Sequence, residues 1–226
     1  MKQAMETFYK EFYNELVFRQ HQGILQEDTT VGKGVCSALC YEWVKQNLDG
    51  TYKVGDWTKE PAIFRKFAMP ADSPIGRKFP HLTNVRIGMR KVQPGMALSQ
   101  RIANLSMNTR GVEHNFDLLG SRDGRMVALV QKWKGMKGGS ADVFEFLEKH
   151  NARFFQGYAL IGLANAPGGG GHAVACQLAG SINRYYDPNF GEFKFTDSGR
   201  FAEAFHLSWA LAEYTFRDLY LWNMYL

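Results

Sequence analysis

Three widely separated residues of the chain could together perform nucleophilic chemistry. Cys36 supplies a thiol, His172 an imidazole and Asp187 a carboxylate, in that order along the sequence. A thiol attacks as its thiolate, an imidazole can accept and return the proton, and a carboxylate can hold the imidazole in the required tautomer and orientation. Each of the three must therefore lie in a local setting that suits its role.

Cys36 falls at the predicted start of a helix. Apolar residues recur after it at helical spacing until the helix-breaking pair Asp49-Gly50, namely Leu39, Cys40, Trp43, Val44 and Leu48. A helix N-terminus offers unpaired backbone N–H groups and the positive end of the helix dipole, and both favour a thiolate. Gly34 lets the backbone turn tightly before the cysteine. The alternative is that Cys36 is a small buried apolar residue.

The other two cysteines fit a place in the core better. Cys40 lies one turn further along the predicted helix, on its apolar face. Cys176 stands in the apolar run 173–176, which indicates a strand buried on both faces. Three cysteines are an odd number and too few for a disulfide framework in 226 residues. We therefore expect a reducing compartment and at least one free thiol.

His172 and Asp187 are predicted to lie beside each other across a hairpin. His172 begins a strand directly after the glycines 168–171, which leave room for a substrate and allow the loop to move. Asp187 ends the next strand, fifteen residues later. Neighbouring antiparallel strands can hold a carboxylate beside an imidazole, whose other nitrogen then faces the thiol. The alternatives are a structural histidine and ordinary turn chemistry in the Asp-Pro-Asn sequence.

The segments that carry these residues resemble the YopT/AvrPphB family of bacterial effector cysteine proteases. They are GVCSALCYEW at 34–43, GHAVA at 171–175 and YYDPNFGEF at 185–193. The resemblance implies an α+β papain-like fold, with the catalytic cysteine at a helix N-terminus and the histidine and aspartate on a central antiparallel sheet. It makes Cys36 the nucleophile, His172 the general base and acid, and Asp187 the orienting carboxylate, with no cofactor.

The same resemblance implies a virulence function. It suggests delivery from the bacterium into a host cell without a cleaved signal peptide, action in the host cytosol or at the inner face of the membrane, and a host protein as substrate. We expect a thiol protease that works through a thioacyl-enzyme intermediate. A deamidase, transglutaminase or acyltransferase toxin with the same three residues is the alternative, because the bound acyl group can pass to different acceptors.

One position departs from the family pattern. Papain-like enzymes usually place Gln or Asn five or six residues before the cysteine to help hold the oxyanion, and here these positions are Val31 and Thr30. The backbone N–H of Cys36 can still donate, and Gln26, Thr30 or another side chain could complete the oxyanion hole. Losing one such donor costs roughly 10²-fold or more in acyl-transfer rate. This departure makes efficient peptide hydrolysis less expected and favours reactions on substrates that are easier to cleave or are held differently.

A structural zinc module is the alternative from another class. Cys36 and Cys40 on a helix, and His172 and Cys176 on a strand, each place two ligands on roughly one face. Structural zinc sites more often use Cys-x₂-Cys turns, and the arrangement leaves Asp187 without a role. We therefore expect no metal.

The chain is predicted to form a single papain-like catalytic domain over 1–226, with an N-terminal helix and loop over 1–30. No apolar run is long enough to span a bilayer, and the first residues lack the apolar stretch of a secretory signal. Helices are expected over 3–20, 36–48, 99–107, 141–150 and 200–214, strands over 158–163, 172–178, 184–186 and 193–195, and a strand or a helix over 219–226.

Positive charge is concentrated in the middle of the chain. Residues 51–150 contain 17 Lys or Arg against 9 Asp or Glu, whereas the remainder contains 10 against 13. A cluster such as Lys132, Lys134 and Lys137 could meet an anionic membrane surface or an acidic partner, or be a solvated surface. The charge suits an acidic-loop or kinase-like substrate at least as well as a polybasic one. We find no nucleic-acid motif and expect a monomer without a nucleic-acid partner.

Overall fold

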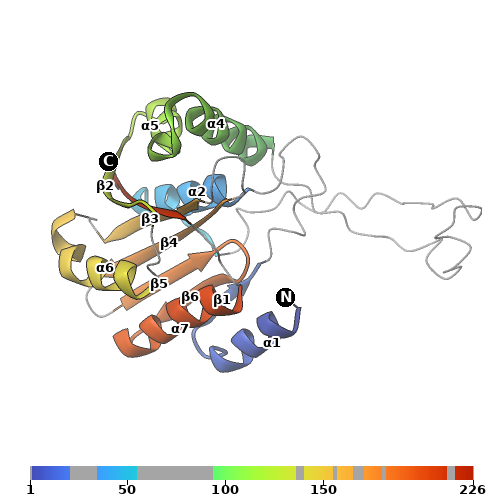
Figure 1. Ribbon diagram of the computed structural model, residues 1–226. Coiled ribbons are helices and arrows are strands. Elements are labelled where there is room, and N and C mark those ends of the chain that lie inside the picture. Colours follow the sequence, from blue (N-terminus) through green and yellow to red (C-terminus); the bar gives the residue numbers. More distant parts are fainter. Residues whose placement is uncertain are drawn as a thin grey trace, which may run out of the picture.

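A sheet of seven antiparallel strands runs through the molecule in the order β1-β6-β5-β4-β3-β7-β2 (Figure 1). The computed structural model describes residues 2–20, 35–54, 94–135, 140–154, 157–164, 171–179, 182–212 and 217–225. The helices are α1 (Lys2–Glu11), α2 (Cys36–Leu48), α4 (Pro94–Arg110), the 3-10 helix η3 (Val112–His114), α5 (Asp117–Arg122), α6 (Ser140–Phe154) and α7 (Ser198–Leu211). The strands are β1 (Leu16–Arg19), β2 (Met126–Trp133), β3 (Tyr158–Ala164), β4 (Gly171–Ala179), β5 (Ile182–Asp187), β6 (Gly191–Phe195) and β7 (Asp218–Tyr225).

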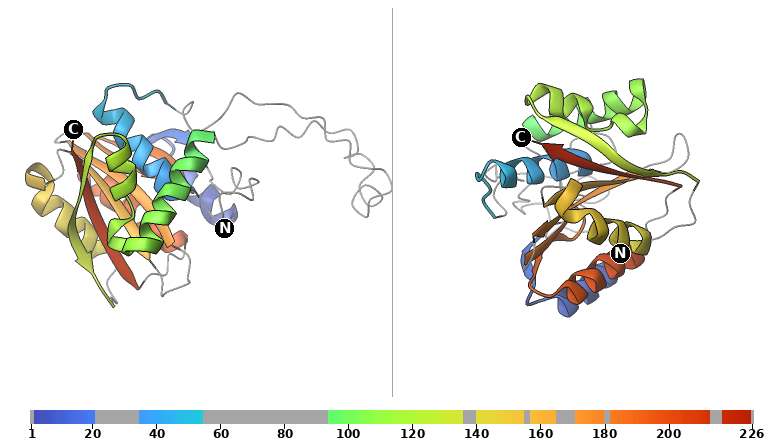
Figure 2. Two further views of the ribbon diagram at one scale, coloured as in Figure 1. Left: turned by 90° about the horizontal axis from the view of Figure 1, so that it is seen from above. Right: turned by 90° about the vertical axis from the view of Figure 1, so that its left-hand side faces the viewer.

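Helices cover both faces of this sheet (Figure 1 and Figure 2). α2, α4 and α5 lie on one face, and α1, α6 and α7 lie on the other. Each face has its own hydrophobic core, and β4 serves both, because successive side chains of a strand point to opposite faces. Ala173 and Ala175 belong to the core under α2, whereas Val174 and Cys176 belong to the core under α7. The prediction that this strand is buried on both faces is confirmed.

The helix that follows the first cysteine agrees with its prediction. α2 begins at Cys36 and ends at Leu48, and Asp49 and Gly50 follow it as a turn. Four of the five apolar positions at helical spacing are fully buried, namely Leu39, Cys40, Trp43 and Val44, and Leu48 is partly buried. Cys40 therefore lies in the core, as expected.

The N-terminal segment differs from the expected helix over 3–20. α1 ends at Glu11, and Leu16–Arg19 forms the edge strand β1, which pairs with β6. The prediction is wrong in its second half because pairing with a strand distant in sequence outweighs the local helical spacing. Gly191 makes this pairing possible: it has a φ of +106°, and a Cβ atom there would lie 2.1 Å from the carbonyl oxygen of Phe18. Only glycine tolerates such a close approach.

The remaining expected elements are confirmed, with shifted ends. The helices expected over 99–107, 141–150 and 200–214 correspond to α4, α6 and α7. The four predicted strands correspond to β3, β4, β5 and β6, and the last segment is the strand β7. β2 was not among the expected strands. The loop expected before Cys36 lies outside the described residues.

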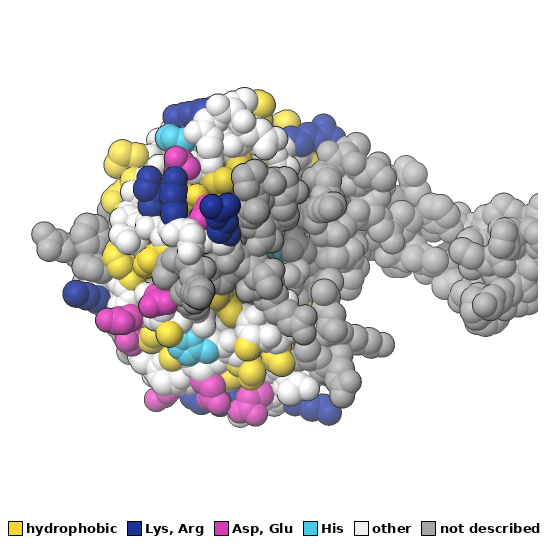
Figure 3. Space-filling model, in the orientation of Figure 1, with side chains coloured by type: hydrophobic (Ala, Val, Ile, Leu, Met, Phe, Trp, Pro, Cys, Tyr) yellow, Lys and Arg dark blue, Asp and Glu magenta, His cyan; other side chains and the backbone are white. Residues whose placement is uncertain are grey.

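Charged side chains are unevenly distributed on the face seen in Figure 3. Asp and Glu gather in its lower half, on the side of α6 and α7, while Lys and Arg are more frequent in its upper half. Lys132 and Lys134 are exposed at the end of β2, and Lys137 lies outside the described residues. None of the helices in the described ranges combines the length and apolar character needed to span a bilayer.

Candidate active site

The first turn of α2 is held from the side of α4. Cys36 is its first residue, and the N-cap residue Val35 offers no side-chain hydrogen bond. The side chain of Gln100 accepts a hydrogen bond from the backbone N–H of Ala38 through Oε1, at 3.0 Å. A helix leaves its first N–H groups without partners inside the helix, so Gln100 supplies the missing acceptor. The nucleophile candidate thus stands on a fixed helix start.

A second contact fixes the residue next to the cysteine. Asn115, between η3 and α5, donates through Nδ2 to the hydroxyl of Ser37 at 3.1 Å. Both side chains are buried. The start of α2 is therefore tied to two different elements on its far side from the sheet.

His172 and Asp187 share one face of the hairpin formed by β4 and β5. Cys176 is paired with Tyr185 in this hairpin, so even-numbered residues of β4 and odd-numbered residues of β5 point the same way. Nε2 of His172 lies 2.9 Å from Oδ1 of Asp187. The carboxylate is fully buried, and its Oδ1 also accepts the backbone N–H of Asn189 at 2.8 Å. The structure thus brings the predicted imidazole and carboxylate together.

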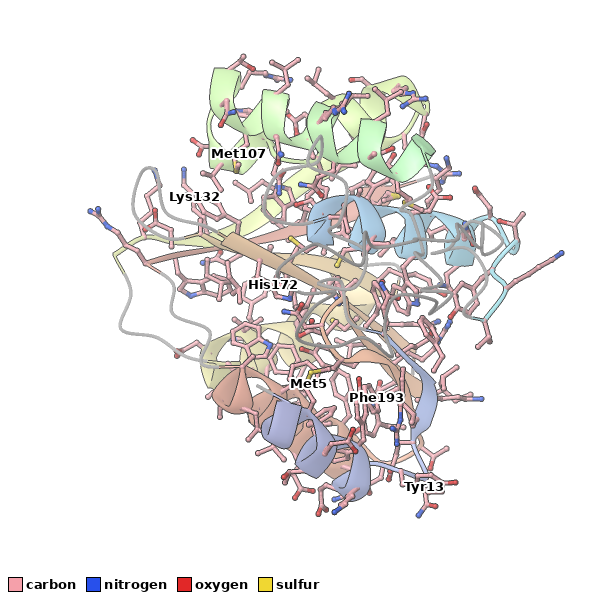
Figure 4. The ribbon with its side chains drawn as sticks, turned by 90° about the vertical axis from the view of Figure 1, so that its right-hand side faces the viewer. Met5, Tyr13, Met107, Lys132, His172 and Phe193 are labelled. Atoms are coloured by element: carbon pink, nitrogen blue, oxygen red, sulfur yellow. The ribbon has the colours of Figure 1, made fainter. Side chains whose placement is uncertain are left out.

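The thiol joins this pair at the start of β4. Cys36 and His172 are joined by a hydrogen bond between their side chains, and the backbone of Ala173 also bonds to the sulfur. In Figure 4, His172 is labelled just below the first turn of α2. Since Nε2 of the imidazole is engaged by Asp187, Nδ1 is the nitrogen left for Cys36. The three predicted residues form one connected group.

Electrostatics favour the ionised form of both partners. Burial alone would raise the pKa of the Cys36 thiol, but the hydrogen bond and the charge of His172, with backbone groups of Ala173 and Ser37, lower it overall. Burial would lower the pKa of His172, but the charge and hydrogen bond of Asp187, together with Cys36, raise it to about 10. Both shifts favour a thiolate beside an imidazolium.

The other cysteines behave differently. Burial raises the pKa of Cys40 well above its usual range and that of Cys176 to about 12. Both side chains are fully buried and carry free thiols. The thiols of Cys40 and Cys176 therefore remain protonated at physiological pH. The side chain of Cys36 differs from them also in that it retains some exposure to solvent, at 8%. Among the described residues, no group of three or more His, Cys, Asp or Glu side chains is placed to hold a metal ion.

Several residues suggested by the sequence lie outside the described parts of the chain. They are Gly34, the glycines 168–170, the oxyanion candidates Gln26 and Thr30, and Val31, one of the two positions where the family usually has Gln or Asn. Conversely, three residues with a place at the site were not predicted: Tyr185 contacts Asp187, while Gln100 and Asn115 contact Ala38 and Ser37, next to Cys36. Tyr185 stands two residues before Asp187, so the period of a strand already places it on the same face. Gln100 is a polar residue among the buried positions Met96, Ala97 and Ala103 of α4, which is the pattern that could have revealed it.

Comparisons with known proteins agree with this geometry. The sequence model of a peptidase family, C58, described as Yersinia/Haemophilus virulence surface antigen, matches residues 103–215, which is half of the chain. The matched range contains His172 and Asp187 and begins after Cys36. No curated protein sequence matches.

Solved structures similar to the chain include the following two. The avirulence protein AvrPphB from Pseudomonas has a TM-score of 0.53 and 14% sequence identity, over 93% of this chain and 98% of its own. PatoxP, a cysteine protease-like domain of the Photorhabdus asymbiotica toxin PaTox, has a TM-score of 0.38 and 11% identity, over 98% of this chain and 58% of its own. The likeness to AvrPphB confirms the papain-like α+β fold class.

Proposed function

The chain belongs to the Yersinia/Haemophilus virulence surface antigen family of cysteine proteases, and on this premise we propose that it cleaves a host protein through Cys36, His172 and Asp187. The observation that carries the proposal is the connected group of three side chains, with Nε2 of His172 2.9 Å from Oδ1 of Asp187 and its other nitrogen left for Cys36. A thiolate at a helix start and an imidazolium beside it are the two groups that acyl transfer from a peptide requires.

The reaction follows from these positions. The Cys36 thiolate attacks the scissile carbonyl carbon, and backbone N–H groups at the start of α2 can stabilise the oxyanion that forms. The protonated Nδ1 of His172 then gives its proton to the leaving amine as the C–N bond breaks, which leaves a thioester on Cys36. Nδ1 next removes a proton from water, which attacks the thioester and releases the carboxylic acid and the thiolate. Asp187 stabilises the imidazolium throughout.

The basic region 51–150 suggests the character of the substrate or its surroundings. In its described part, Lys132 and Lys134 are exposed at the end of the edge strand β2. We propose that this region meets an acidic partner or an anionic membrane surface, since opposite charges steer association.

The proposal is tested by mass spectrometry of host proteins after exposure to the wild-type chain and to the Cys36→Ala variant. We expect new protein N-termini that appear with the wild type and not with the variant. Deamidated or cross-linked host proteins without new N-termini would instead indicate a deamidase or transglutaminase. New N-termini that persist with Cys36→Ala would exclude Cys36 as the nucleophile.

A further inference from the structure

Asp187 is held from the side opposite His172 by a chain of two hydroxyl groups. The phenol of Tyr185 lies 3.2 Å from Oδ2 of Asp187, and the hydroxyl of Ser208 on α7 lies 2.9 Å from the phenol oxygen. All three side chains are fully buried. An ionised carboxylate can only accept hydrogen bonds, so the phenol proton points to Asp187. The single hydroxyl proton of Ser208 is shared between the phenol oxygen of Tyr185 and the backbone carbonyl of Phe205, each 2.9 Å from Oγ.

The carboxylate of Asp187 is therefore held by hydrogen bonds at both of its oxygens. Oδ1 accepts from Nε2 of His172 and from the backbone N–H of Asn189, and Oδ2 accepts from Tyr185. A carboxylate that is free to rotate about its last bond would present either oxygen, or neither, to the imidazole. With Oδ2 engaged from behind, its plane is fixed and Oδ1 stays directed at Nε2.

We propose that Tyr185, supported by Ser208, is a positioning residue of the catalytic group that fixes the carboxylate of Asp187 toward His172. This inference rests on the proposed roles of Cys36, His172 and Asp187. The reaction needs the imidazolium to be stable beside the thiolate, and a carboxylate with a fixed direction stabilises it more than a mobile one. Tyr185 thus acts through Asp187 and touches no reacting atom.

The other titratable groups around Asp187 do not compete with this effect. Tyr9 of α1, Tyr186 of β5 and Cys40 of α2 all feel the charge of Asp187, and burial raises the pKa of each, that of Tyr9 to about 12. Tyr185 itself has its pKa raised well above the usual range, by burial first and by Asp187 second. Glu192, which faces Tyr186, is paired with Arg184. These tyrosines and Cys40 therefore stay protonated at neutral pH, so a shift in the pH profile of Cys36 alkylation reports on the thiol and its partner His172.

The test replaces Tyr185 by phenylalanine, which keeps the ring and removes the hydroxyl. A hydrogen bond to a charged group contributes enough that we expect kcat to fall roughly tenfold to a hundredfold, with KM unchanged. The pH midpoint for alkylation of Cys36 should move upward, because a less stable imidazolium supports the thiolate less. If the hydroxyl of Tyr185 served only in packing, Tyr185→Phe would lower the midpoint of thermal unfolding but leave the pH profile of Cys36 alkylation unchanged.

The matched control is Tyr186→Phe, at the next residue of the same strand. Its hydroxyl donates to Oε1 of Gln20 at 3.1 Å, and its ring packs on the opposite face of the sheet, against Trp43. This variant also loses one buried hydroxyl, but it should keep the wild-type kcat and alkylation profile. Ser208→Ala, which removes the donor to Tyr185, should shift the profile in the same direction as Tyr185→Phe by a smaller amount.

The outcomes separate this inference from the proposed function. If Asp187→Asn shifts the alkylation profile while Tyr185→Phe and Ser208→Ala keep that of the wild type, the positioning role is wrong and the catalytic group stands. If Asp187→Asn itself matches the wild type, the catalytic group is wrong. Should Tyr185→Phe not fold, Ser208→Ala decides: an unshifted profile overturns the inference.

Discussion

Nε2 of His172 lies 2.9 Å from Oδ1 of Asp187, and this contact joins the start of β4 to the end of β5 on one face of their hairpin. The buried carboxylate faces an imidazole whose pKa it raises, so the pair is most stable with its proton on the imidazole. The geometry therefore provides a proton donor for a leaving group.

Substitution of Asp187 by asparagine should remove most activity without unfolding the protein. Asparagine has the same shape and can still accept the N–H of Asn189, but it can favour the wrong imidazole tautomer and cannot stabilise its charge. We expect kcat to fall by roughly 10³-fold to 10⁴-fold, as in other sites of this kind. Steady-state kinetics measure the loss, and circular dichroism checks the fold. Retention of wild-type kcat would remove Asp187 from the site.

Alkylation should distinguish Cys36 from the two core cysteines. Its pKa is lowered, so iodoacetamide should label it at pH values below the usual thiol pKa of about 8.5, while Cys40 and Cys176 stay unreactive in the folded protein. Peptide mapping by mass spectrometry identifies the labelled residue. Faster labelling of Cys40 than of Cys36 would contradict the assignment.

The activity should persist to unusually high pH, so that kcat falls on the basic side only near the raised pKa of His172. The pKa of His172 is raised to about 10, so the proton needed by the leaving amine is present below that pH and is lost above it. On the acid side, activity should persist until the thiolate of Cys36 is protonated, below the ordinary range of thiols. A pH profile of kcat whose basic limb lies near 6.5, the ordinary value for histidine, would show that Asp187 does not support the imidazolium.

Replacement of Gln100 by glutamate should weaken the thiolate. The new carboxylate can still accept the N–H of Ala38, but its charge lies beside the first turn of α2 and repels the anionic sulfur two residues earlier. The alkylation midpoint of Cys36 should therefore rise. Gln100→Met is the uncharged control, which loses the acceptor and should cost about 1 kcal/mol of stability, as the loss of a helix cap does. Equal alkylation midpoints in the two variants would exclude the charge effect.

Loss of Glu192 should destabilise the fold strongly. Its fully buried carboxylate is bonded to Arg184, whose Nε lies 2.8 Å from Oε1, to the indole N–H of Trp43 at 3.2 Å and to the phenol of Tyr52. Breaking a buried pair leaves a charge without its partner and costs about 3 to 5 kcal/mol, so urea denaturation of Glu192→Ala should show a loss of this size.

The control for this prediction is a charge pair at the surface. Arg200 is bonded to Glu11 and Glu203 near the start of α7, with 34% of its side chain exposed. Exposed pairs contribute less than about 1 kcal/mol, so Arg200→Ala should change the urea midpoint little. Equal losses in the two variants would mean that the buried pair contributes no more than an exposed one.

The sequence predicted those parts of the fold whose signal is local. The apolar spacing after Cys36 and the continuous apolar run around Cys176 were sufficient for α2 and β4, because each pattern is set by the faces that the element buries. The strand Leu16–Arg19 could not be predicted, because it pairs with Phe193 and Glu192, and the residues next to the strand in sequence give no sign of this distant pairing. β2 was missed for a similar reason: its side chains are only partly buried, so it lacks a clear alternation.

The same division holds at the site. Cys36, His172 and Asp187 were identified from their own settings and from a resemblance of short segments. Gln100 and Asn115 reach the start of α2 only through the packing of α4 and η3 against it, and no local pattern indicates which helix they will meet. Their roles required the positions of distant elements.

β7 is the last element in the sequence, yet it lies inside the sheet, between β3 and β2. Both neighbours are synthesised before it, and the row that pairs Leu160 with Trp222 and Trp222 with Leu129 cannot form on the ribosome until β7 itself has emerged. Contacts between residues distant in sequence also slow folding, because the chain loses the entropy of closing long loops before these contacts form and stabilise it. A chain that ends before Asp218 would leave β3 and β2 with facing unpaired edges, a hazard for aggregation.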